Sequence, residues 1–266
     1  MPASSDRNRK IARTLRAWRS LITGSLTLPL APSTPSLRRA IIAGETLQSK
    51  LPLVRLDTLV SPLLSDADYL SLTALPTVDH NCSLFELLVL GTITRAIKPR
   101  RSFEIGTFDG RSALAIAANA PHDSHVFTLN LPPEPPPTRP DGSLGFDEQL
   151  ASKVTSGHRW QAHPEAVRIS QLFGNSLAFD FSPYAPSQLI FIDGGHAEPI
   201  VRSDTARCLD FIDRNDGIIL WHDATRYGVK PALEDLARHG RRIHLIDGTS
   251  IAFLRFLNRQ EVPFPY

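Results

Sequence analysis

The stretch that predicts the fold runs from residue 102 to residue 112 and reads SFEIGTFDGRS. Its first half has the apolar character of a buried strand, and a turn with Gly106 and Gly110 then leads into a helical pattern. Because glycine lacks a Cβ atom, the backbone of such a turn can approach a ligand closely. In open parallel sheets, ligands bind beyond the carboxyl ends of the strands, where these turns lie. The stretch therefore predicts an α/β domain with a ligand site at this turn.

Strand and helix patterns alternate along the chain around this turn. Besides 102–107, six segments have strand patterns: 125–131, 167–175, 188–194, 217–223, 242–248 and 250–256. Helical patterns lie at 83–97, 112–120, 199–213 and 232–238. The alternation predicts a doubly wound, mostly parallel, seven-stranded sheet of the Rossmann-like kind. The last two strand patterns surround a short turn, so we expect an antiparallel C-terminal hairpin at the sheet edge.

The first 80 residues differ in character and predict an N-terminal helical arm with a linker, followed by one domain over residues 81–266. Residues 11–22 fit a basic amphipathic helix, and three prolines between residues 29 and 35 indicate a linker. Such a helix either faces solvent and partner proteins or binds a membrane surface, and the pattern leaves both open. We expect the arm to be the surface through which a homo-oligomer forms.

Composition excludes few classes of protein. The chain has 266 residues and a formal net charge of +2, so its overall charge predicts no nucleic-acid partner. The two cysteines, Cys82 and Cys208, are too far apart in sequence and too few to indicate a disulfide framework, which favours a reducing compartment. No apolar stretch reaches the length of a membrane span. We therefore expect a cytoplasmic protein without a transmembrane segment.

The turn itself does not fit the common phosphate-binding loops. It lacks the Gly-Lys-Ser/Thr ending of one class and the Gly-x-Gly-x-x-Gly spacing of dinucleotide sites. Glu104 and Asp109 instead bring negative charge, which suits a ligand with a positive centre such as a sulfonium or an amino group. A nicotinamide-dependent oxidoreductase would also need a Tyr-x-x-x-Lys pair, which the sequence lacks. A hydrolase is a poor fit, because no serine lies in a nucleophile-elbow pattern.

Two segments together resemble a known family. EIGTFDGRSA (104–113) resembles the first motif of class I S-adenosylmethionine-dependent methyltransferases. The run 191–236 resembles the methyltransferase-24 branch of small-molecule O-methyltransferases, with an Ile-Asp-Gly-x-His element, a crossover helix and a His-Asp pair at the end of the next strand. The resemblance covers about residues 80–256, and it implies an S-adenosylmethionine-dependent methyltransferase.

The resemblance also implies which residues bind the cofactor. The methionine end would be lined by Glu104, Gly106, Thr107, Asp109, Gly110 and Ser112, and Asp193 would complete the cofactor site. Asn130 stands where an acid usually binds the ribose hydroxyls, and Asn175 stands where an Asp often meets the adenine amino group. An amide can still hydrogen-bond these groups, but it loses the strength that a charged carboxylate provides.

Three residues are the catalytic candidates: Asp193, His196 and His222. In one version, Asp193, His222 and Asp223 hold a divalent metal such as Mg²⁺ or Mn²⁺, as similar positions do in catechol-type methyltransferases. The histidine departs from that pattern, because magnesium prefers oxygen ligands. In the other version, His196 or His222 acts as a general base, since imidazole has a pKa near neutrality. Both versions stay open, and so do purely structural roles for the two histidines.

The predicted function is methyl transfer from S-adenosylmethionine to a small-molecule acceptor, with a hydroxyl oxygen as the expected acceptor atom. Such a reaction needs a positioned acceptor and a proton acceptor more than it needs a nucleophile. The alternative is a catalytically weak or inactive binding or scaffold protein that keeps the fold. Asn130, Asn175 and His222 support this alternative, because each departs from the family pattern.

Overall fold

The computed structural model describes residues 48–76, 80–132 and 155–262. These residues belong to the second of two compact units, which spans residues 42–266. The predicted helix at 11–22, its linker and their part in an oligomer lie outside the described residues. Within the described part of the chain, no helix combines the length and the hydropathy that crossing a membrane requires.

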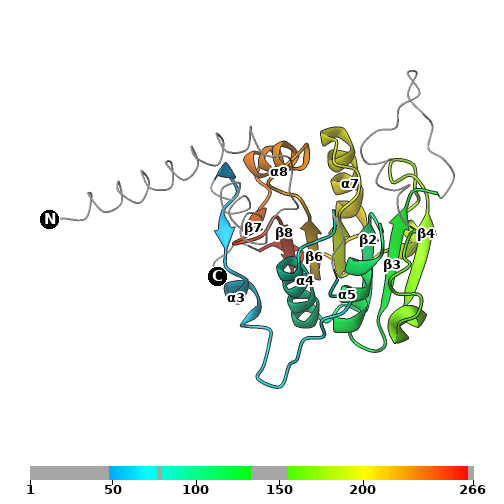
Figure 1. The fold of residues 1–266 in the computed structure, drawn as a ribbon. Helices are drawn as coiled ribbons and strands as arrows, with labels where there is room; N and C mark the ends of the chain where they lie inside the picture. The colour runs from blue at the N-terminus through cyan, green and yellow to red at the C-terminus, as the bar shows by residue number, and fades with distance from the viewer. Residues whose placement is uncertain (1–47, 77–79, 133–154, 263–266) are drawn as a thin grey trace, which may run out of the picture. The chain divides into compact units, whose positions relative to one another are not determined.

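A mixed sheet forms the centre of this unit (Figure 1), in the order β1-β7-β8-β6-β5-β2-β3-β4, with β9 paired to β8. The strands are β1 (Leu53–Val54), β2 (Arg101–Ile105), β3 (His125–Asn130), β4 (Ile169–Phe173), β5 (Leu189–Ile192), β6 (Asp216–Trp221), β7 (His244–Ile246), β8 (Ala252–Leu257) and β9 (Gln260–Glu261). The five strands β6, β5, β2, β3 and β4 follow one another in this order, and each pairs in parallel with its neighbour. The predicted doubly wound sheet is confirmed, and its seven strands are β2 to β8.

The predicted C-terminal hairpin is also present, but it does not form the edge of the sheet. β8 lies between β6 and β7 and is antiparallel to both. The two-residue strand β1 then pairs in parallel with β7 and forms the edge on this side. A strand of two residues is too short for alternation to reveal, so the sequence could not predict it. Residues 53–54, which the sequence assigned to the arm, thus belong to the sheet.

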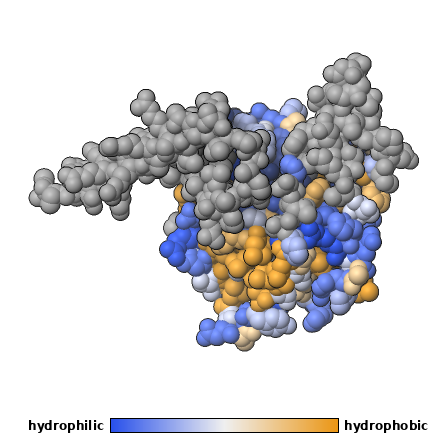
Figure 2. Space-filling model, viewed as in Figure 1, coloured by the Kyte–Doolittle hydropathy of each residue, from blue (hydrophilic) through white to orange (hydrophobic). Residues whose placement is uncertain are grey.

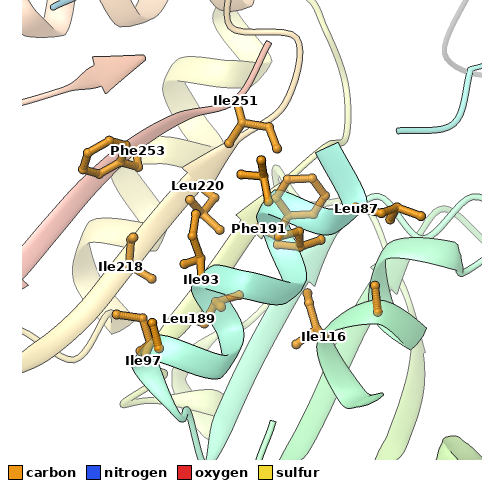
Figure 3. Packing of buried hydrophobic residues seen from close by; sticks show 14 of the residues in the cluster. Leu87, Ile93, Ile97, Ile116, Leu189, Phe191, Ile218, Leu220, Ile251 and Phe253 are labelled. Carbon is orange, nitrogen blue, oxygen red and sulfur yellow. The ribbon is translucent and has the colours of Figure 1, made fainter. Parts of the chain in front are cut away.

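Helices cover both faces of the sheet. They are α3 (Leu56–Val60), α4 (Leu84–Ile97), α5 (Arg111–Asn119), α7 (Glu198–Phe211) and α8 (Val229–Arg238). One core lies between the sheet and the helices α4 and α5, and Figure 3 shows its residues Ile93, Ile116 and Phe191 packed together. A second core lies on the opposite face, against α7 and α8. Both faces of β5 are therefore buried, which explains its continuous apolar run.

Helix α4 has well-defined ends. A capping box begins it, in which the Ser83 side chain accepts a hydrogen bond from the Glu86 backbone and the Glu86 side chain accepts one from the Ser83 backbone. Lys98 adopts a left-handed conformation after the last turn, and the proline that follows cannot continue the helix. Figure 2 shows an apolar area on the face that carries α4. At the start of α4, the side chains of Leu84 and Phe85 are about half exposed.

Candidate functional site

The predicted turn joins β2 to α5 and carries two glycines with positive φ, +100° at Gly106 and +89° at Gly110. A Cβ atom on Gly106 would overlap the backbone of Asp193, which follows β5. A Cβ atom on Gly110 would overlap the indole ring of Trp160. Phe108, between them, also has a positive φ of 47°, which is unusual for a residue with a large side chain. The turn is therefore a strained segment that only glycine at 106 and 110 allows.

Glu104 is fully buried on β2, immediately before this turn. The Thr128 hydroxyl donates a hydrogen bond to Glu104 Oε2 at 2.5 Å, whereas Glu104 Oε1 has no hydrogen-bond partner. Burial raises the pKa of the Glu104 carboxyl to about 8, although the nearby hydroxyl groups of Ser112 and Thr128 act in the opposite direction. A buried carboxylate oxygen without a partner is costly. A cationic ligand group beside it would satisfy that oxygen and favour the ionised form.

A chain of hydrogen bonds connects Glu104 to the predicted ribose position. The Thr107 and Thr128 hydroxyls lie 2.7 Å apart, and Gln171 Nε2 donates to Thr107 Oγ1 at 3.0 Å. Ser156 Oγ donates to Gln171 Oε1 at 3.1 Å and accepts from Asn130 Nδ2 at 3.0 Å. The structure thus brings Glu104, Thr107 and Asn130 into one polar network, of which sequence reasoning missed Gln171 and Ser156.

The other predicted cofactor residues have different surroundings. Asp109 is 1% exposed, and its Oδ2 atom forms an ion pair of 2.5 Å with Arg159 Nε. Asp109 Oδ1 accepts a hydrogen bond from the Arg111 backbone. Asn175 is exposed after β4, and its side-chain oxygen accepts from the Leu177 backbone at 3.0 Å, a local turn contact. The contacts of Asp109 and Asn175 are therefore with the protein itself.

Arg111 ties the turn to the segment that precedes α4. Its side chain is buried and donates hydrogen bonds to the carbonyl groups of Ala74, Leu75 and Cys82. Arg159 adds a fourth such bond, to the carbonyl of Pro76 at 2.7 Å. The sequence carried no signal for these contacts, because the partners are backbone atoms of a segment far from both arginines.

The predicted catalytic residues converge where β5 and β6 end. His222 Nδ1 lies 3.1 Å from Asp193 Oδ1 and 3.7 Å from Asp223 Oδ2. His196 Nε2 lies 3.3 Å from the same Asp223 oxygen. The side chains of Asp193, His196 and Asp223 are 16–19% exposed, whereas His222 is 8% exposed. Neighbouring parallel strands end at the same edge of the sheet, which is why residues far apart in sequence meet here.

Glu86 and Cys82 are residues of this cluster that sequence reasoning missed. The Oε2 atom of Glu86 lies 3.4 Å from His222 Nε2, so both ring nitrogens of His222 face carboxylates. Burial lowers the pKa of His222, but the negative charges of Asp193, Asp223 and Glu86 outweigh it and raise the pKa well above its ordinary value. In the sequence, the spacing of Ser83 and Glu86 is typical of a helix cap. This pattern does not show that the Glu86 side chain is buried.

Two groups of side chains have donor atoms close enough to hold a metal ion. Cys82, Asp193 and His222 form one group, and Asp193, His196 and Asp223 form the other, with all donor atoms of a group within 4.8 Å of one another. The second group is the more open, since its three side chains are all partly exposed. The sequence predicted Asp193, His222 and Asp223 as ligands, and the structure brings them together with His196 beside them.

Two further residues, one on α7 and one on β6, are completely buried. Asp204 on α7 is 0% exposed, and burial raises its pKa to about 6. Trp221 at the end of β6 is also 0% exposed, and its indole N–H donates a hydrogen bond to Thr205.

Residues 103–224 match the model of the methyltransferase-24 family, which is described as a methyltransferase domain. Residues 103–224 form a methyltransferase domain. The predicted resemblance to class I S-adenosylmethionine-dependent methyltransferases is therefore confirmed, as is the prediction of an enzyme of that kind. Every predicted site residue of the methyltransferase lies inside the matched segment, whereas Cys82 and Glu86 lie outside it.

Several solved structures are similar to this methyltransferase. A methyltransferase from Podospora anserina, bound to S-adenosylhomocysteine, is 16% identical, with 86% of this chain and 99% of that chain covered and a TM-score of 0.49. The O-methyltransferase TomG from Streptomyces achromogenes, in complex with S-adenosylmethionine, is 16% identical over 88% and 92% of the chains, with a TM-score of 0.46. An O-methyltransferase from Bacillus cereus is 14% identical over 88% and 94%, with a TM-score of 0.45. Similarities this low carry no argument about ligands. No curated protein matches the sequence.

Proposed function

We propose that this methyltransferase transfers the methyl group of S-adenosylmethionine to a hydroxyl oxygen of a small-molecule acceptor. The observation that carries the proposal is the buried Oε1 atom of Glu104, which has no partner and lies beside the glycine turn at the carboxyl end of β2. A carboxylate in that position fits the ammonium or sulfonium group of the cofactor. Bound there, S-adenosylmethionine would supply a methyl group already activated by the positive charge on sulfur.

The cluster of Asp193, His196 and Asp223 supports the acceptor side of the proposal. His196 is the better general base of the two predicted histidines, because its side chain is 17% exposed, whereas His222 is 8% exposed and has a carboxylate at each ring nitrogen. Asp223 lies 3.3 Å from His196 Nε2, so it can orient the ring and stabilise its protonated form. His196 then takes the proton that the acceptor hydroxyl loses as its oxygen gains the methyl group.

A divalent metal is the second way to activate the hydroxyl. Asp193, His196 and Asp223 would hold it, since their donor atoms lie within 4.8 Å of one another. A mixed set of carboxylates and imidazole suits Mn²⁺, Fe²⁺ or Zn²⁺ better than Mg²⁺. The metal would lower the pKa of a bound hydroxyl. An experiment can distinguish the general-base version from the metal version, because only the metal version depends on an ion that a chelator removes.

A binding or scaffold protein with the same fold is the competing candidate. The observation in its favour is that part of the turn contacts the protein itself, because Arg159 pairs with Asp109 and Trp160 packs on Gly110. This candidate predicts no transfer of methyl groups to any acceptor.

Methyl transfer itself tests the proposal. We expect the protein to move labelled methyl from S-adenosylmethionine to members of a panel of phenols, catechols and sugar hydroxyls. Asp193→Ala should reduce the rate about 100-fold or more, because it removes a group that positions the acceptor. Asp210 is an exposed residue of α7, so Asp210→Ala is the matched control and should leave the rate unchanged.

The metal version has its own test. Loss of turnover when a chelator is added, with recovery when Mn²⁺ is added, would favour the metal version. Turnover by Asp193→Ala at the wild-type rate, or transfer to nitrogen and sulfur acceptors alone, would contradict the proposal.

A further inference from the structure

The side chain of Glu86 is held at several points, although it is almost completely buried. It is 4% exposed and occupies the third position of α4. Glu86 Oε2 accepts a hydrogen bond from the Ser83 backbone at 2.9 Å. Glu86 Oε1 accepts two from Ser250, one from the backbone at 3.0 Å and one from the hydroxyl at 2.6 Å. The carboxylate is therefore fixed between the start of α4 and the turn that connects β7 to β8.

A capping box does not require this burial. Capping glutamates interact with a backbone N–H at the helix start, which they can do at the surface. Burying a carboxylate is costly unless it is paired and hydrogen-bonded. Glu86 is both, since Oε2 also lies 3.4 Å from His222 Nε2. The contact with His222 is the part of its surroundings that the helix cap does not explain.

The opposite side of the His222 ring faces the candidate active site. His222 Nδ1 lies 3.1 Å from Asp193 Oδ1, and the ring of Phe191 packs edge-on against the imidazole with centroids 6.2 Å apart. A ring with a carboxylate at each nitrogen has one favourable orientation, because a flip would place carbon atoms against both carboxylates. Glu86 and Asp193 together thus fix which ring atom of His222 meets Asp193, with the Glu86 contact at Nε2 an ion-pair contact and not a hydrogen bond.

We infer that Glu86 is a positioning residue of this methyltransferase: it holds His222 so that Nδ1 orients the Asp193 carboxylate at the methyl-transfer site. The inference rests on the proposed function for its catalytic consequence, but the orientation of the ring is a property of the protein alone. Glu86 and Ser250 both lie outside the segment that matches the methyltransferase domain family. The helix before the domain therefore contributes a residue to the site.

The orientation of His222 can be measured without substrate. In protein labelled with ¹⁵N-histidine, the signals of His222 are identified by their loss in His222→Gln. We expect Glu86→Gln to shift both His222 nitrogen signals, because Nε2 loses its carboxylate and the ring loses its fixed contact with Asp193. Ser83→Ala is the matched control: it removes the other half of the capping box and leaves the Glu86 carboxylate in place. It should cost helix stability and leave the His222 signals unchanged.

Activity and binding complete the test. Glu86→Gln should lower kcat about 10-fold to 100-fold, because small misplacements of active-site groups have effects of this size. Its affinity for S-adenosylhomocysteine should stay at the wild-type value, and Glu86→Asp should recover part of kcat. If Glu86→Gln does not fold, Ser250→Ala replaces it, since it removes the 2.6 Å bond that holds the carboxylate.

The outcomes separate the two claims. His222 signals that are unchanged in Glu86→Gln would overturn the inference, whatever the turnover. Equal losses of kcat in Glu86→Gln and Ser83→Ala would also overturn it, because they would show a helix-capping role alone. Shifted His222 signals in a protein that transfers no methyl group would support the positioning of the ring and refute the proposed function.

Discussion

At the scale of single residues, the buried carboxyl of Glu104 has the clearest measurable consequence. Its pKa is raised from an ordinary value of 4.5 to about 8, chiefly by burial. The folded protein therefore favours the neutral carboxyl, while the unfolded chain ionises it above pH 4.5. The contribution of Glu104 to the free energy of unfolding is fully present at low pH and is lost as pH rises from about 4.5 to about 8.

This pH dependence predicts the behaviour of Glu104→Gln in the absence of ligand. The amide cannot ionise, so the variant should lack the loss of stability that wild type shows over this range. The difference between the two proteins should grow with pH, to at most about 5 kcal/mol above pH 8. Urea unfolding at pH 5, 6.5 and 8 measures it. Parallel pH profiles of wild type and variant would show that Glu104 is ionised in the free protein.

At the scale of elements, Arg111 joins the turn after β2 to the segment before α4. Arg111→Met keeps much of the apolar stem but removes donors to three carbonyl groups. We expect it to destabilise the protein by about 3 kcal/mol, because buried groups lose their partners. Protease cleavage within residues 70–82 should also become faster. Arg100→Met removes an exposed arginine, 77% accessible, and should change neither measurement. A variant at Arg111 as stable and as resistant as this control would refute the role.

The elements also show how far prediction from sequence reached. The strand patterns at 102–107, 188–194 and 217–223 predicted β2, β5 and β6. The metal version of the predicted site placed Asp193 beside His222 and Asp223, which the structure brings together. The fold class, the helices α4, α5, α7 and α8 and the hairpin followed from the same periodicities, whereas the five-residue helix α3 was not predicted. The strand β1 could not be predicted, because two residues are too few to show the alternation of apolar and polar side chains that marks a strand.

Long-range polar contacts were the other limit. Asp109 is an acidic residue in the glycine turn, where the sequence predicts contact with the cofactor. In the structure its partner is Arg159, a residue 50 positions away. Glu86 has the pattern of a helix cap, yet it lies against His222. In both cases local sequence shows the residue type and its element, and only the folded chain shows the partner. The direct contact of Asp109 with a cofactor stays a prediction.

At the scale of the whole molecule, the account depends on one ligand position: the turn between Glu104 and Ser112, with the transferred methyl facing Asp193 and His196. A ligand that binds only the folded state must raise its stability. Calorimetric titration with S-adenosylhomocysteine and S-adenosylmethionine, on wild type, Glu104→Gln and Asp210→Ala, tests this position most directly. We predict that wild type binds both ligands saturably. The affinity of Glu104→Gln should be at least tenfold weaker, because a hydrogen bond to a charged group contributes about 1.5–3 kcal/mol. The affinity of Asp210→Ala should equal that of wild type. An absence of binding, or equal affinities in wild type and Glu104→Gln, would contradict the account.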